Sequence, residues 1–100
     1  MLAIINQVFE LEQKLQSRDD LSAERNFKRI FHEFEEMGYR VINPINRKYS
    51  ETDSDIEATL PATLNGDLRI TRVLKPVIYQ KGNIDDISLV QKGIVIVEAV

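Results

Sequence analysis

The chain has 100 residues, 43% of them hydrophobic, and a net charge of −3, which suits one domain with a modest core. Acidic and basic residues are mixed along it, without the basic block that a phosphate backbone requires, so we expect no nucleic-acid ligand. With no cysteine there is no disulfide or thiolate metal site, which fits a reducing, cytoplasmic location. The opening residues lack the pattern of a signal peptide, and no apolar run reaches membrane-spanning length, so we expect no membrane contact.

The first 16 residues have the spacing of an amphipathic helix. Apolar side chains recur four, three and four positions apart at Ile4, Val8, Leu11 and Leu15. We therefore predict a helix over residues 2–16. The following segment, SRDDLS, interrupts the pattern, and either Asp20 or Ser22 can cap the next helix.

A second helical stripe follows, with spacings of four, three, four and three at Ala23, Phe27, Ile30, Phe34 and Met37. Phe31 widens its apolar side, and Gly38 supplies the left-handed residue that ends a helix. Residues 1–38 are thus predicted to form a helical hairpin. Each exposed phenylalanine would forgo about 1.5–3 kcal/mol of burial, so the apolar side must be covered.

The cover is either the sheet of the same chain or the hairpin of a second chain. Two such hairpins have a period suited to a four-helix bundle, and we favour a homodimer. The predicted dimer interface consists of Ile4, Val8, Leu11, Leu15, Phe27, Ile30, Phe34 and Met37.

Beyond Gly38, strand signals accumulate, and residues 39–100 are predicted to form a β head. The runs are YRVINP, IEATL, LRITRVL, VIY, ISLV and GIVIVEAV. Asn65-Gly66 is a strong hairpin signal between the runs that end at Leu64 and begin at Leu68, and Gly82-Asn83 a weaker one. Three prolines keep the strands short: Pro44, Pro61 and Pro76. The predicted class is α+β, with a compact, mostly antiparallel sheet or open barrel of four to six strands.

The sequence contains no catalytic constellation. His32 is the only histidine, so a catalytic triad or a multi-histidine metal site is excluded. His32 is interpreted either as an exposed helix residue or as a pH-sensitive contact, and we assign it no role. No glycine-rich phosphate loop follows a strand. We therefore expect no enzyme activity and no cofactor.

Two charged segments have a structural and a functional interpretation each. In ETDSDIE, residues 51–57, alternate carboxylates can hold a hard cation, but the glycine of a calcium loop is missing, so we interpret the segment as a solvated loop and predict no metal. Arg69, Thr71 and Val73 are predicted to point to one side of a strand, and Ile70, Arg72 and Leu74 to the other, with Lys75 following. Such charges either deter edge pairing or form a docking strip for an acidic protein.

The order of elements resembles the GrpE family, the nucleotide exchange factors of DnaK-type heat-shock chaperones. FEEMGYRVINP resembles the family's passage from helical hairpin through glycine into a strand that ends before proline. KYSETDSDIEATL is similar to its aromatic-led acidic segment, NGDLRITRVLKPVIY to its glycine-led strand, and SLVQKGIVIV to its last strand. The resemblance spans nearly the whole chain, without the family's long N-terminal coiled-coil helix.

The resemblance implies a homodimeric co-chaperone whose β head binds the nucleotide-binding domain of a DnaK-type chaperone and promotes ADP release. The residues that it implies for this contact are Arg69, Arg72, Lys75, Tyr79, Gln91 and Lys92. Ser88 and Gln91 stand where the family's final strand usually has arginines. This difference favours the alternative, a GrpE-like scaffolding module that does not exchange nucleotide.

Overall fold

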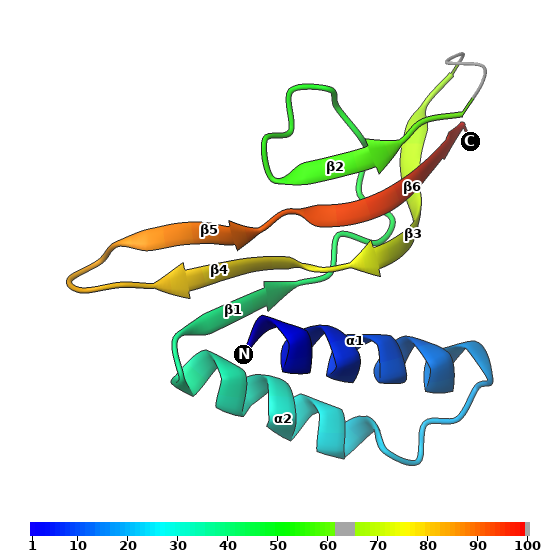
Figure 1. Cartoon of the computed structure of the whole chain (residues 1–100). Helices are drawn as coiled ribbons and strands as arrows, with labels where there is room; N and C mark the ends of the chain where they lie inside the picture. The colour runs from blue at the N-terminus through cyan, green and yellow to red at the C-terminus, as the bar shows by residue number, and fades with distance from the viewer. Residues whose placement is uncertain (62–65, 100) are drawn as a thin grey trace.

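The computed structural model describes residues 1–61 and 66–99, which form two helices followed by six strands (Figure 1). In chain order they are α1 (Leu2–Ser17), α2 (Glu24–Glu36), β1 (Tyr39–Ile42), β2 (Ile56–Thr59), β3 (Leu68–Lys75), β4 (Val77–Lys81), β5 (Ile87–Gln91) and β6 (Gly93–Ala99). The α+β class is confirmed, and each of the six predicted strand runs contains a strand.

The two helices run antiparallel along one side of the strands (Figure 1). Gly38 ends the hairpin as expected, because its φ of 92° suits a residue without a side chain and its N–H donates to the Glu35 carbonyl at 2.9 Å. The predicted cap of α2 is wrong. The N-cap residue is Ala23, which makes no side-chain cap bond, while Asp20 Oδ1 accepts hydrogen bonds from the backbone N–H (3.0 Å) and hydroxyl (2.6 Å) of Ser22.

The strands form two three-stranded sheets instead of one, with the orders β1-β4-β5 and β2-β6-β3. Only Pro76 separates β3 from β4, and only Lys92 separates β5 from β6. The antiparallel pairs β3–β6 and β4–β5 are therefore two parts of one long ribbon that passes from one sheet into the other (Figure 1). Pro76 has no backbone N–H to donate, which is consistent with a break in the ladder at this point.

The two predicted hairpin turns differ in outcome. The hairpin at Gly82-Asn83 is confirmed, because β4 and β5 pair antiparallel. Its loop is longer than these two residues, since the Gly82 N–H donates to the Asp86 carbonyl at 2.6 Å. The turn at Asn65-Gly66 lies partly outside the described residues. The strands on either side of it, β2 and β3, do not pair with each other, because β6 lies between them and pairs in parallel with β2. Alternate residues of β6 are buried, and both of its edges are hydrogen-bonded, which makes it the central strand.

Two core clusters lie between the helices and the sheets. The first consists of Phe9, Ile56, Ile70, Val73, Val77, Val95 and Val97. The second consists of Ile5, Phe34 and Ile78, with Val8 and Phe31 among the half-buried side chains that pack against it. Each cluster combines α1 with strands, so the hairpin and the β head share their cores.

Of the two covers considered for the phenylalanines of α2, the favoured one, the hairpin of a second chain, is wrong. Phe27 is only 6% exposed and Phe34 only 5% exposed within a single chain. Their cover comes from the same chain, since Phe34 packs with Ile5 of α1 and Ile78 of β4. Neither side chain is free to form a dimer interface.

The predicted alternation along β3 is also wrong beyond Ile70. Ile70 and Val73 are both buried, with exposed Thr71 and Arg72 between them. The register against β6 shifts between Ile70 and Arg72, and such a bulge changes which side the later residues face. Val73 therefore lies in the core, away from the exposed side of Arg69.

Candidate interaction surfaces

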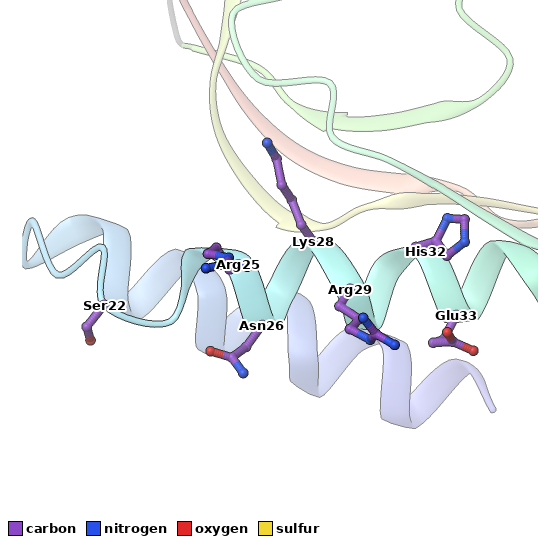
Figure 2. Close-up of a pocket in the computed structure, with 7 residues that line it drawn as sticks. All are labelled: Ser22, Arg25, Asn26, Lys28, Arg29, His32 and Glu33. Atoms are coloured by element: carbon purple, nitrogen blue, oxygen red, sulfur yellow. The ribbon is translucent and has the colours of Figure 1, made fainter.

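The outer side of α2 is an open, charged surface with a hollow of about 910 Å³ (Figure 2). It is lined by Ser22, Arg25, Asn26, Lys28, Arg29, His32 and Glu33. Lys28 points toward the strands, whereas Asn26, Arg29 and Glu33 point away from them. His32 is an exposed helix residue that pairs with Glu36 at 3.6 Å, and its side chain is 65% exposed. The surface suits a charged protein partner more than a small molecule, because it is open.

Part of the predicted dimer interface remains exposed on the hairpin. The exposed fractions are 57% for Ile4, 52% for Leu11, 36% for Ile30 and 51% for Met37. Val8 and Leu15 are half-buried. The apolar surface available to a partner is therefore smaller than the sequence indicated, since it lacks Phe27 and Phe34.

The cations of β3 are exposed at the edge of their sheet. Arg69, Arg72 and Lys75 all face solvent, and the Arg69 guanidinium donates to the Asn46 carbonyl at 3.2 Å. Beside Arg69 the edge is covered by a bridge to Lys48. Arg72 lines a cleft of about 450 Å³ between β3 and α1. Their exposure would allow these cations to bind an acidic protein surface. Their position at the edge of the sheet fits equally well with the other interpretation, that they prevent this edge from pairing with another strand.

Two other predicted contact residues are engaged inside the molecule. The side-chain amide of Gln91 donates to Asn6 Oδ1 at 2.9 Å and to the Pro76 carbonyl at 2.8 Å, and its oxygen accepts from Asn6 Nδ2 at 2.8 Å. Gln91 therefore holds α1 against the strands, and both polar atoms of its side chain are engaged within the chain. Tyr79 is half-buried and packs against the first core cluster, whereas Lys92 is exposed.

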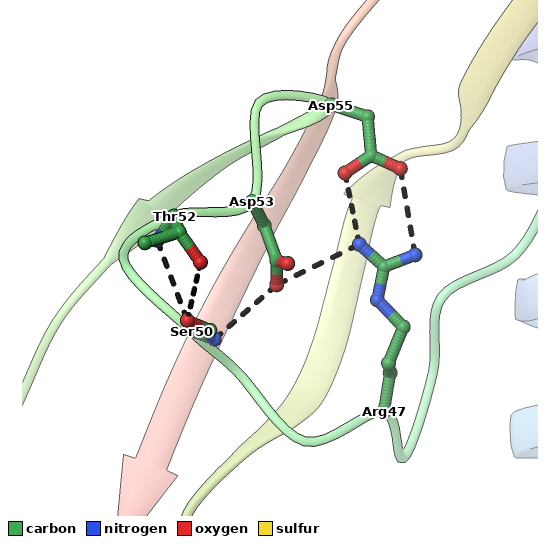
Figure 3. A network of polar contacts seen from close by, with 5 residues as sticks. All are labelled: Arg47, Ser50, Thr52, Asp53 and Asp55. Carbon is green, nitrogen blue, oxygen red and sulfur yellow. Dashed lines mark hydrogen bonds and ion pairs between the residues drawn. The ribbon is translucent and has the colours of Figure 1, made fainter.

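The acidic segment is organised by an arginine that precedes it (Figure 3). Arg47 Nη2 lies 2.9 Å from Asp55 Oδ1 and 3.8 Å from Asp53 Oδ2, while Nη1 donates to Asp55 Oδ2 at 3.4 Å. Asp53 also accepts from the Ser50 backbone N–H at 3.2 Å. The guanidinium thus occupies the place that a cation would need. No group of three metal-ligating side chains is found among residues 1–61 and 66–99.

Reasoning from sequence missed Arg47 because it lies outside the acidic run. An arginine a few residues before closely spaced aspartates was the available signal, since its planar guanidinium suits bidentate binding of carboxylates. Sequence reasoning also missed Glu12, which lines a cavity of about 290 Å³ with Lys28 and Phe31. Burial, with a smaller contribution from the negative charge of Glu24, raises the pKa of Glu12 above its ordinary value.

Comparison with known proteins finds no matching protein family, no matching curated protein and no matching solved structure. Within the described part of the chain, neither helix is long and apolar enough to cross a membrane.

Proposed function

We propose that this chain is a cytoplasmic, homodimeric co-chaperone of the GrpE type, which binds the nucleotide-binding domain of a DnaK-type heat-shock chaperone and promotes ADP release. The observation that carries the proposal is the order of its elements. Two antiparallel helices pass through Gly38, in a left-handed conformation, directly into β1 and a head of short strands. This order is the one on which the sequence resemblance rests.

The mechanism needs no catalytic group. A protein that binds the open form of a nucleotide-binding cleft more tightly than the closed form lowers nucleotide affinity by linkage. The exposed cations Arg69, Arg72 and Lys75 of β3, with Lys92 between β5 and β6, are the proposed contacts. They would meet an acidic surface and mainly affect the rate of encounter and the orientation of binding.

The homodimer is proposed to form through the helical hairpin. Its support is the apolar surface that the single chain leaves exposed at Ile4, Leu11, Ile30 and Met37. Ile4 and Leu11 are two turns apart on α1, and Ile30 and Met37 are two turns apart on α2, so each helix exposes one apolar strip to a partner. In such a dimer each β head stays packed against the buried sides of its own two helices. The exposed residues of the head therefore remain free to bind another protein.

The second candidate is a GrpE-like scaffolding module that binds the chaperone without exchanging nucleotide. Two observations favour it. Gln91, at a position where the family usually has an arginine, makes three hydrogen bonds within the chain, and Ser88 is exposed but uncharged. Both candidates dock through the β head, so only a kinetic measurement separates them.

The test is the release rate of a fluorescent ADP analogue from a DnaK-type chaperone, with and without this protein. Acceleration supports exchange, and binding without acceleration supports scaffolding. Arg69→Glu combined with Arg72→Glu should abolish the effect. The matched control, Arg40→Glu with Lys81→Glu, reverses two exposed cations on the other sheet and should retain it. Absence of any binding would contradict both candidates.

A further inference from the structure

Charge is segregated along the exposed side of α2. Arg25 and Arg29 lie in its first half, and Glu33 and Glu36 in its second half, all of them exposed. Apart from Glu24 in the first turn, this order opposes the helix macrodipole, which favours acidic groups near the N-terminus and basic groups near the C-terminus. The arrangement therefore does not serve the stability of the isolated helix.

Pairing within the helix does not account for the arrangement either. Arg29 and Glu33 are one turn apart, yet the one close contact between a basic and an acidic side chain of α2 within the described residues is His32 Nε2–Glu36 Oε1 at 3.6 Å, which is an ion pair only with a protonated histidine. An arginine that precedes a glutamate by four positions is also the weaker orientation for such a pair. Arg25, Arg29 and Glu33 thus keep their charges available to a partner.

We propose that this side of α2 binds the same side of a second copy of the chain, with the two helices antiparallel. A two-fold axis level with Phe31 places Arg29 of each copy opposite Glu33 of the other. The same axis places Glu36 of each copy opposite Arg25 and Asn26. The surface is thus complementary to itself, as a two-fold interface requires. A parallel pair would instead bring like charges together, which disfavours association.

The flank of this charged surface supplies apolar contact. Asn26, Ile30, Glu33 and Met37 follow one another at intervals of four, three and four, which places them along one side of the helix. Ile30 is 36% exposed and Met37 51% exposed, so both can be buried by the second copy.

The geometry also decides where the heads lie. The opposite side of α2 carries Phe27 and Phe34 into the core of its own chain. In the antiparallel pair the two β heads are therefore on the outside, with β3 of each copy accessible. The inference rests on the homodimer of the proposed function and on none of its chaperone chemistry.

A pair of charge-reversal variants tests the proposal. Arg25→Glu with Arg29→Glu makes positions 25, 29, 33 and 36 all acidic, and Glu33→Arg with Glu36→Arg makes the same four positions all basic. In analytical ultracentrifugation each variant alone should be monomeric, with a dimer dissociation constant raised roughly a hundredfold, because four like charges on one copy then face the same four on the other. An equimolar mixture should recover dimers, since the acidic helix of one variant complements the basic helix of the other.

The control is Lys28→Glu with Glu35→Arg, which reverses two exposed charges that line the other cavity of the same helix and should leave the dimer intact. Lys28 also borders the outer hollow, but it points toward the strands, whereas Arg29 and Glu33 point away from them. The acidic variant should remain folded by circular dichroism, because its charges now agree with the macrodipole. The proposal is overturned if either variant alone remains dimeric or if the mixture stays monomeric. A monomeric wild-type protein would contradict the homodimer as well as this interface. The rate of ADP release with the wild-type protein tests the exchange activity independently of this result.

Discussion

Asn6 and Gln91 bind each other through their side-chain amides, each donating to the other, at 2.8 and 2.9 Å. The pair joins the first turns of α1 to the last residue of β5, 85 positions away. Gln91 also donates to the Pro76 carbonyl, at the point where the ribbon passes from one sheet into the other. The amide pair therefore fixes the hairpin against both arms of the ribbon.

Asn6→Ala should lower the free energy of unfolding by about 1–3 kcal/mol, because it leaves the part-buried amide of Gln91 without one of its partners. Urea denaturation measures the change. The double variant Asn6→Ala with Gln91→Ala should cost less than the sum of the two single variants. Gln7→Ala, an exposed neighbour on α1, is the control. Additive effects of the two substitutions would show that the amides are not coupled.

Phe34→Ala should destabilise the single chain by about 3–5 kcal/mol, because this side chain fills the second core cluster. Met37→Ala removes an apolar side chain that is 51% exposed, and should change monomer stability much less. Thermal unfolding at a concentration below that of dimer formation distinguishes the two. Similar losses for both variants would contradict the single-chain core.

Gly93→Ala should destabilise the fold by about 1–3 kcal/mol through overpacking. A Cβ at this position would lie 2.9 Å from Val77 Cγ2 and 3.1 Å from Ile56 Cδ1, both in the first core cluster. Gly82→Ala is the matched control, since its Cβ would meet no atom closer than 3.5 Å. Equal midpoints in urea for the two variants would be inconsistent with the tight packing at β6.

Glu12→Gln should raise stability at neutral pH. Burial, and secondarily the charge of Glu24, raise the pKa of Glu12, so the native state holds its proton more tightly than the unfolded state does. The stability that protonated Glu12 contributes is fully present below about pH 4.5, the ordinary pKa of this side chain, and is lost as the pH rises through the higher pKa of the native state. Thermal midpoints measured across this window should converge for the two proteins at low pH and diverge above it. Parallel curves would refute the assignment.

The sequence by itself determined the elements. The helical spacing of Ile4 to Leu15 and of Phe27 to Met37 predicted both helices, and the structure ends each within one or two residues of the predicted position. At the start of α2 the predicted cap, Asp20 or Ser22, was wrong, since the N-cap residue is Ala23. Gly38 marked the change of period, and each strand run contains a strand. These features depend on backbone preferences and on the spacing of apolar residues within a short segment, so the local sequence is enough to predict them.

Only the tertiary structure decided which surfaces meet. The stripe of α2 showed that Phe27 and Phe34 must be buried, but not that the same chain buries them. Likewise, only the structure shows that β6 lies between β2 and β3. It also shows that Arg47 pairs with Asp53 and Asp55, and that Gln91 forms hydrogen bonds with Asn6 of the same chain. An apolar or polar pattern specifies that a side chain needs a partner. The choice of partner depends on contacts between distant segments, whose free energies are decided by the packing of the whole chain.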